Sequence, residues 1–380
     1  MPTAFDPIVL GGRELASRIV MAPMSRSRAY GPAATPGPSA ARYYAQRAGA
    51  GLIISEGISP SPAGHGYPAT PGLYTQAQVT AWRPVTDAVH AAGGVIFAQL
   101  MHGGRIGHPS MLPGGAVPLA PSPVRADTQV FTRTGPQPCV RPREMTAGDI
   151  ARAIEEFAVA ASNAVAAGFD GVEIHAGNGF LVHQFLAGNA NTRTDEWGGS
   201  VGNRIRFAVE VTAAAAAAVG PDRAGVQVSP GNPYNDIAEQ DGEVLYPALA
   251  AALSQPRLAY LGVAETGGTG LTPALRAAWP GVLILNPHAD QRPAGPGRLR
   301  LVEEGVADMV SFGVLFLANP DLPARLARGG PFNQPDPATF YGGGDAGYVD
   351  YPPLTDSGPA GSAPGVQGDV EQQVRPRIAG

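Results

Sequence analysis

Residues 173–186 read Glu-Ile-His-Ala-Gly-Asn-Gly-Phe-Leu-Val-His-Gln-Phe-Leu. The run from Gly171 to Ile174 has the pattern of a short strand buried on both faces. His175 ends this strand, and Asn178 follows three residues later. Two hydrogen-bonding side chains at the carboxyl end of a buried strand predict a polar clamp, formed by His175 and Asn178, at the mouth of a barrel.

Short apolar runs alternate with helical patterns along the rest of the chain. We expect strands at Ile19–Ala22, Leu52–Ser55, Val95–Leu100, Gly171–Ile174, Gly225–Ser229, Ala259–Val263, Val282–Leu285 and Met309–Phe312. We expect helices at about residues 40–48, 76–92, 146–167, 202–219, 243–254, 271–278, 297–305 and 318–328. Repeated strand–helix units in one chain of 380 residues predict an α/β protein with a single closed (β/α)8 barrel, the TIM barrel.

Two segments lie outside this repeat. Residues 103–145, after the third strand, are rich in Gly and Pro and predict an insertion that forms a lid or wall of the active site. Residues 352–380 are rich in Pro, Gly and Ser with few large apolar side chains, so a disordered tail is expected there. The expected organisation is one barrel domain over residues 1–351, with the insertion at 103–145, followed by the tail.

Composition restricts the chemistry that the barrel can perform. All 26 basic residues are arginine, which excludes Schiff-base catalysis and a P-loop lysine. The net charge is −5 and no basic run occurs, so nucleic acid is not an expected partner. The single cysteine, Cys139, allows neither an internal disulfide nor a thiolate metal cluster, and no metal site is expected.

The first residues show no charged segment followed by an apolar core, so no signal peptide is expected. No uninterrupted apolar run reaches the length that a membrane span needs. The sequence therefore predicts a cytoplasmic protein without a membrane partner, and it leaves a homo-oligomer open.

Several motifs occur in order between about residues 5 and 353. They are Met21-Ala-Pro-Met-Ser25-Arg, Gly51-Leu-Ile-Ile-Ser-Glu56, Ala98-Gln99-Leu-Met-His102-Gly-Gly-Arg105, the segment around His175, Arg193-Thr-Asp-Glu-Trp-Gly-Gly-Ser200 and Phe340-Tyr-Gly-Gly-Gly344. Together they resemble the Old Yellow Enzyme family. The resemblance implies a (β/α)8 barrel and an ancestry of FMN-dependent reduction of activated alkenes by NAD(P)H.

The same resemblance implies roles for the polar residues. His175 and Asn178 would hold the carbonyl or phenolate oxygen of a ligand that is stacked on the flavin. If FMN is bound, Gln99 would bond the pyrimidine edge of the flavin. Ser25 stands where a threonine or cysteine normally touches flavin O4.

The substrate pocket that the resemblance implies would be lined by Tyr67 and Tyr341. Met101 replaces a frequent tryptophan and would widen this pocket. The family usually carries tyrosine at position 180, the acid that protonates the alkene after hydride transfer. Phe180 has no proton to give, and we expect it to be an apolar wall of the pocket.

Three departures from the family pattern fall at the charged ends of the flavin. Gln227 stands where an arginine normally faces flavin N1 and O2. The seventh strand lacks the Gly-rich turn that cradles the FMN phosphate, because Pro287 has no N–H and Asp290 would repel an anion. Val314 replaces the arginine that clamps the phosphate. Such losses cost on the order of several kcal/mol of binding.

From these departures we expect a protein that has lost FMN and uses no cofactor. It would be an isomerase or cyclase of natural-product biosynthesis that catalyses a redox-neutral isomerisation, epimerisation or cyclisation, such as a cycloaddition, of a hydrophobic carbonyl compound. His175 and Asn178 would be catalytic by polarising the carbonyl. If a proton must move, His175 is the first candidate to carry it and His288 the second. Gln227 and His288 would join the substrate pocket.

Two alternatives remain open at this point. The first is an FMN-dependent ene-reductase or desaturase that acts on an α,β-unsaturated carbonyl compound with NAD(P)H. The second is a non-catalytic protein that binds a hydrophobic ligand.

Overall fold

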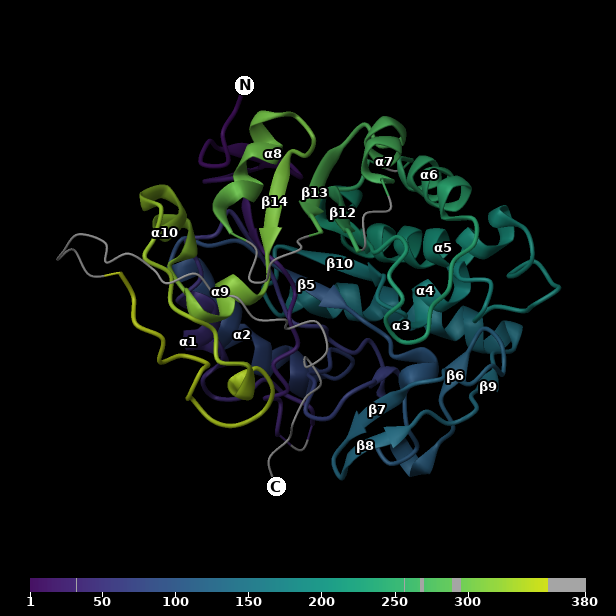
Figure 1. The fold of residues 1–380 in the computed structure, drawn as a ribbon. Coiled ribbons are helices and arrows are strands. Elements are labelled where there is room, and N and C mark those ends of the chain that lie inside the picture. The colour runs from purple at the N-terminus through teal and green to yellow at the C-terminus, as the bar shows by residue number, and fades with distance from the viewer. Residues whose placement is uncertain (32, 256, 267–269, 289–294, 355–380) are drawn as a thin grey trace.

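The computed structural model describes residues 1–31, 33–255, 257–266, 270–288 and 295–354. A closed barrel of parallel strands forms its centre (Figure 1). In the order in which they pair, the strands are β3 Ile19–Met21, β4 Leu52–Ile54, β5 Ile96–Leu100, β10 Gly171–Ala176, β11 Ala224–Val228, β12 Tyr260–Ala264, β13 Val282–Asn286 and β14 Met309–Phe312. Pairing of β14 with β3 closes the barrel. The predicted TIM barrel is confirmed.

The predicted strands match the observed ones to within one residue at each end, except for β10. This strand runs two residues further than expected, to Ala176. His175 therefore lies inside the strand, where it is paired in register with Gln227 of β11. The pairing fixes the height of His175 at the barrel rim.

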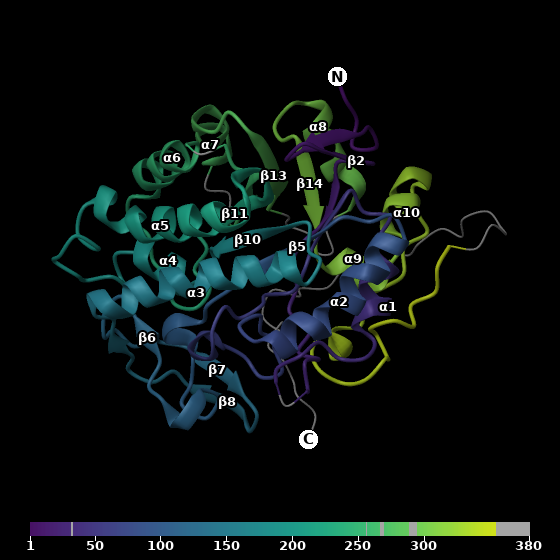
Figure 2. The ribbon, with the colours of Figure 1, turned by 180° about the vertical axis from the view of Figure 1, so that it is seen from behind.

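Helices surround the barrel. They are α1 Ala40–Ala45, α2 Gln76–Ala91, α3 Ala147–Ala166, α5 Val201–Val219, α6 Gly242–Leu253, α7 Thr272–Ala278, α8 Arg300–Glu303 and α10 Leu322–Arg328. Figure 2 shows α1, α2, α3 and α5 following one another along one side. The start of α3 agrees with the sequence, because Thr146 and Asp149 form a reciprocal capping box.

Two short helices were not predicted. They are α4 Leu181–Leu186 and α9 Val314–Ala318, and they follow β10 and β14 directly. Both lie at the carboxyl ends of strands, so they help to form the face of the barrel that carries active sites in this fold. Single-turn 3₁₀ helices occupy Pro62–Gly64, Gly104–Ile106, Pro113–Gly115, Pro221–Arg223, Pro296–Leu299 and Pro337–Thr339.

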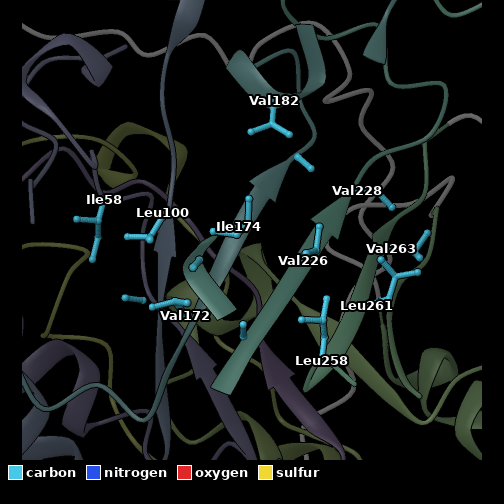
Figure 3. Packing of buried hydrophobic residues seen from close by; sticks show 14 of the residues in the cluster. Ile58, Leu100, Val172, Ile174, Val182, Val226, Val228, Leu258, Leu261 and Val263 are labelled. Carbon is cyan, nitrogen blue, oxygen red and sulfur yellow. The ribbon is translucent and has the colours of Figure 1, made fainter. Parts of the chain in front are cut away.

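Apolar side chains form two layers. One cluster of buried residues fills the barrel and is joined by Leu10 and Leu15 of a hairpin formed by β1 Ile8–Leu10 and β2 Arg13–Leu15. The second and larger cluster lies between the strands and the helices. Figure 3 shows part of it, with alternate side chains of β10, β11 and β12: Val172, Ile174, Val226, Val228, Leu261 and Val263. This alternation is what a strand buried on both faces requires.

The insertion at residues 103–145 has strands of its own. An antiparallel hairpin joins β7 Gln129–Thr132 to β8 Gly135–Pro138, and β6 Leu119–Ala120 pairs with β9 Arg143–Glu144. A small apolar cluster of Ile106, Ala126, Val130 and Cys139 holds the insertion together, and Tyr67 and Met111 pack against it. The insertion therefore packs against Tyr67, one of the residues predicted to line the pocket.

The division of the chain into one domain and a tail stays a prediction. Most of the predicted tail, from residue 355 onward, lies outside the described residues. Within the described ranges, no helix combines the length and apolar character that a membrane crossing requires.

Candidate active site

A cavity of about 1440 Å³ opens at the carboxyl ends of the barrel strands. Residues that follow β3, β5, β10 and β14 all contribute to its wall, among them Ser25, Met101, Asn178 and Val314. Single-ligand pockets are usually about 300–1,000 Å³. This cavity therefore has room for a cofactor together with a substrate.

The cavity brings together most of the predicted site residues: Ser25, Tyr67, Gln99, Met101, His175, Asn178, Phe180 and Tyr341. Gln227 and His288 are not among the described residues that line it, and their places in the substrate pocket stay predictions. Gln227 lies beside Gln99, whose amide N–H donates to its side-chain oxygen at 3.0 Å. His288 lies after β13, where its backbone N–H donates to Glu265 Oε2 at 3.2 Å.

His175 is an uncharged member of the polar clamp. The side chain is 3% exposed, and its Nδ1 has no hydrogen-bond partner among the described residues. Burial, with the neighbouring His183 as a second cause, lowers the pKa of His175 to about 3. The imidazole is therefore neutral near pH 7, and its Nε2 lies 3.4 Å from Asn178 Nδ2.

The backbone of Asn178 is held in the left-handed region, with φ at 52°. Asparagine tolerates this conformation better than most residues. Two contacts fix it: the Asn178 N–H donates to Ser229 Oγ at 2.7 Å, and its carbonyl accepts from Asn235 Nδ2 at 2.8 Å. The next residue, Gly179, also has positive φ, and a Cβ there would lie 2.5 Å from the Asn235 side chain. This close approach requires glycine.

The orientation of the Asn178 amide follows from a chain of hydrogen bonds. The Tyr234 N–H is only a donor, and it donates to Asn232 Oδ1 at 3.0 Å. The Asn232 amide nitrogen is therefore turned to Asn178 Oδ1, to which it donates at 2.7 Å. The Asn178 nitrogen is left facing His175, so the clamp offers an amide N–H donor to the cavity.

Asn232 and Asn235 were missed at the level of sequence. Both lie in the loop after β11, on the catalytic face of the barrel. The presence of two asparagines in one loop at this face was the available signal. Their partners, however, lie about 55 residues away, at separations of 54 and 57 positions.

Beneath Gln99 lies a buried carboxyl group. Gln99 Nε2 donates to Glu173 Oε1 at 2.8 Å, and Tyr260 Oη donates to Glu173 Oε2 at 2.9 Å. Glu173 is 1% exposed, and burial raises its pKa to about 7 although both hydrogen bonds oppose the shift. Because Gln99 uses both amide hydrogens on Glu173 and Gln227, its oxygen remains as an acceptor.

Aromatic rings form the wall beside the polar clamp. The Phe180 ring lies 5.1 Å from the His175 ring and 6.0 Å, edge to face, from the Tyr67 ring. The hydroxyl groups of Tyr67 and Tyr234 are 3.3 Å apart. Burial raises the pKa of Tyr341 to about 12, so this phenol is neutral near pH 7.

Arg298 places a cation at the ends of β13 and β14. Its guanidinium donates to Asn286 Oδ1 at 2.9 Å, to the Pro287 carbonyl at 2.8 Å and to the Ser311 carbonyl at 3.1 Å. TIM barrels often bind phosphate between the loops after strands seven and eight. The expected loss of this anion site rested on positions 287, 290 and 314 and stays a prediction, and position 290 lies outside the described residues.

A model of the NADH:flavin oxidoreductase / NADH oxidase family matches residues 3–333. The chain belongs to this family. A Leishmania infantum protein named "Probable flavin mononucleotide-dependent alkene reductase" is 42% identical over 355 residues, which are 91% of this chain and 96% of that protein. The 12-oxophytodienoate reductase 1 of Oryza sativa subsp. japonica is 40% identical over 91% of this chain and 92% of its own length.

Solved structures agree with this family membership. Morphinone reductase in complex with tetrahydroNAD superposes with a TM-score of 0.88 at 41% identity and covers 94% of this chain and 99% of its own. The Old Yellow Enzyme homologue from Zymomonas mobilis gives a TM-score of 0.88 at 39% identity, over 93% of this chain and 100% of its own. The resemblance to the Old Yellow Enzyme family is confirmed.

These relatives overturn the expectation that the protein uses no cofactor. The family is one of flavin oxidoreductases, and the relative from Leishmania is named for its dependence on flavin mononucleotide. The prediction of no cofactor is therefore wrong, and the flavin-independent isomerase or cyclase receives no support. The protein is an enzyme of the Old Yellow Enzyme family of flavin oxidoreductases.

Proposed function

We propose that this enzyme is an FMN-dependent reductase that uses NAD(P)H to reduce the carbon–carbon double bond of an α,β-unsaturated carbonyl compound. The observation that carries the proposal is the polar clamp: a neutral His175 beside an Asn178 amide whose N–H group faces the cavity. The names of the relatives from Leishmania and rice support the same reaction class.

The clamp suits a substrate carbonyl oxygen. His175 Nε2 and Asn178 Nδ2 lie 3.4 Å apart, and in the His175 tautomer that carries its hydrogen on Nε2 an N–H from each can converge on one acceptor. Withdrawal of charge toward this oxygen makes the β-carbon electron-poor and stabilises the enolate-like charge that develops there. Because His175 stays neutral, the clamp acts as a pair of hydrogen-bond donors without a permanent charge.

The cavity fits the pyrimidine end of the cofactor. The acceptor oxygen of Gln99 suits the pyrimidine N–H of a flavin, and Ser25 would touch O4. When bound, FMN supplies the hydride that it has taken from NAD(P)H. The size of the cavity, and a His175 Nδ1 without a hydrogen-bond partner among the described residues, support a second ligand that stacks beside the flavin.

The remaining wall favours an apolar substrate. Phe180 and Met101 are 5% and 4% exposed and contribute hydrocarbon surface. Tyr341 adds a ring whose phenol remains protonated. This surface excludes water around the reacting carbons, which strengthens the hydrogen bonds of the clamp.

The cofactor is tested first. We expect the purified protein to be yellow and to release about one FMN per chain on denaturation. A colourless preparation that fails to bind added FMN would contradict the proposal.

The reaction is tested with NADPH and a cyclic 2-enone, using the saturated ketone as a blank. His175→Ala should lower turnover by about 10²–10³, the usual effect of losing an oxyanion donor. His108→Ala is the matched control, because the described hydrogen bonds of the His108 side chain go only to Ser110, within the insertion. Equal turnover by both variants would remove the clamp from the mechanism.

A further inference from the structure

Position 180 lacks the phenol that the resemblance expects, but the cavity contains others nearby. The Tyr67 ring packs edge to face against the Phe180 ring, which also contacts the His175 ring, and all three residues line the cavity. The Tyr67 hydroxyl lies 3.3 Å from that of Tyr234. Tyr234 is 52% exposed, so its hydroxyl reaches solvent.

We propose that Tyr67 is the acid that protonates the substrate carbon, and that Tyr234 resupplies it with a proton from water. This inference rests on the proposed alkene reduction. It assigns to a side chain from the loop after β4 the role that a phenol at position 180 would otherwise have.

The position of Tyr67 is fixed from two sides. The apolar cluster of the insertion packs against its ring, and its carbonyl accepts from Thr70 Oγ1 at 3.0 Å. Phe180 contacts both Tyr67 and His175 of the polar clamp, with ring distances of 6.0 and 5.1 Å. A substrate held at its carbonyl oxygen by the clamp and lying over Phe180 therefore extends toward the Tyr67 hydroxyl.

The electrostatics suit a proton donor. Burial raises the pKa of Tyr67 well above its ordinary value of 10. The phenol therefore stays protonated near pH 7 until a strong base removes its proton. The carbanion next to a carbonyl is a far stronger base than a phenolate and can take that proton. The Tyr234 hydroxyl can then donate to the new phenolate oxygen, which makes the transfer easier.

The step balances. The cofactor would supply a hydride, originating from NAD(P)H, to the β-carbon, and the π electrons of the alkene would form the second new C–H bond at the α-carbon. The Tyr67 O–H bond breaks, and its oxygen keeps the electron pair. That oxygen then takes the proton of Tyr234, which recovers one from water. The net addition is one hydride and one proton to the double bond.

The decisive variant is Tyr67→Phe in the FMN-loaded enzyme. Rapid-mixing experiments without oxygen separate flavin reduction by NADPH from flavin reoxidation by the enone. We expect reoxidation by the enone to slow by about 10²-fold or more, the usual effect of losing a general acid. Flavin reduction, and reoxidation by ferricyanide, which needs no proton on carbon, should change by less than about 2-fold on the same basis.

Three further measurements separate this role from a structural one. Tyr74→Phe is the matched control, because it removes a hydroxyl that bonds His65 instead of Tyr234, and it should react like the parent enzyme. A simple phenol should bind Tyr67→Phe with an unchanged dissociation constant, which shows that the clamp is intact. Adding Phe180→Tyr to Tyr67→Phe should restore reoxidation by about 10-fold or more.

If the enone reoxidises the flavin of Tyr67→Phe as fast as that of the parent enzyme, the proposal is overturned. If that variant does not fold, Tyr234→Phe keeps the proposal testable. If Tyr234 resupplies the acid, reoxidation of this variant by the enone slows about 10-fold. An unchanged rate overturns the relay. Failure of the proposed function looks different, because the parent protein itself would then lack FMN or leave the enone unreduced.

Discussion

Glu173→Gln removes the carboxyl group that is buried between Gln99 and Tyr260. We expect the stability of this variant to depend less on pH than that of the parent protein. Burial raises the pKa of Glu173 from an ordinary value of 4.5 to about 7. Glutamine has nearly the same shape as the protonated acid and never ionises, so the two proteins differ mainly in this titration.

The direction follows from the raised pKa. Below about pH 4.5 the carboxyl is protonated in the folded and the unfolded chain, and its contribution to stability is fully present. As the pH rises toward 7, the unfolded carboxyl ionises while the folded one stays protonated, so that contribution is lost. The complete loss of this contribution lowers the free energy of unfolding by about 3 kcal/mol, of which about 2 to 3 kcal/mol is lost between pH 5 and 8.

Thermal unfolding at about pH 5 and pH 8 measures this difference. With an unfolding entropy of about 2.1 cal/mol/K per residue, 380 residues convert it to about 3 °C. Glu173→Gln should therefore unfold about 3 °C above the parent protein at pH 8 and close to it at pH 5. Glu56, whose pKa burial also raises to about 7, is present in both proteins and cancels.

Glu304→Gln serves as the control, because Glu304 is exposed. It should shift both midpoints equally or not at all. If the two midpoints of Glu173→Gln differ by as much as those of the parent, Glu173 does not titrate as its burial requires. A variant that is less stable than the parent at pH 8 would show that the ionised carboxylate stabilises the fold, which refutes the reasoning.

Three other changes test separate parts of the site. Asn232→Ala removes the donor that orients the Asn178 amide, and titration of the yellow enzyme with a phenol should show binding weakened by about 5- to 30-fold, the equivalent of 1–2 kcal/mol. Gln227→Arg adds a cation, and redox titration should find the flavin midpoint potential raised by about 30–60 mV. Burial raises the pKa of Cys139 to about 11, so a disulfide reagent should modify the folded protein about 100-fold more slowly than the unfolded chain at pH 8.

The barrel could be predicted from the sequence because its strands are buried on both faces and appear as short apolar runs. The ends of the strands were less certain, because pairing with a neighbouring strand decides where a strand ends. His175 belongs to β10 because β11 extends far enough to pair Gln227 with it. The helices α4 and α9 have six and five residues, too few for a helical period to be visible in the sequence.

The cavity residues were found through the resemblance, but the side chains that orient them were not. Asn232 acts on Asn178 across 54 positions, and such a contact exists only once two loops meet at the barrel mouth. Comparing this sequence with the family pattern, position by position, detects a residue that has been replaced. It does not detect a residue elsewhere in the chain that reaches the same point in space.

The expectation of a lost flavin, which the relatives overturn, rested on such a comparison of positions. It noted Val314 in place of an arginine and took no account of Arg298, whose guanidinium lies at the ends of β13 and β14. Similarly, Phe180 stands where the family usually has a tyrosine, but the Tyr67 phenol lies beside the Phe180 ring.

The opposite end of the flavin site shows no such replacement. The buried carboxyl of Glu173 accepts hydrogen bonds from Gln99 and Tyr260, which are both uncharged, and Gln227 supplies no cation. A carboxylate at this point would repel the negative charge of a reduced flavin. Burial avoids the repulsion by raising the pKa of Glu173 to about 7, so that a large fraction of the carboxyl is neutral when the flavin is reduced near that pH. If the flavin binds beside Gln99, protonation of Glu173 would make the absence of an arginine at position 227 tolerable. For the same reason, we expect the effect of Gln227→Arg on the flavin potential to be larger above pH 7 than below it.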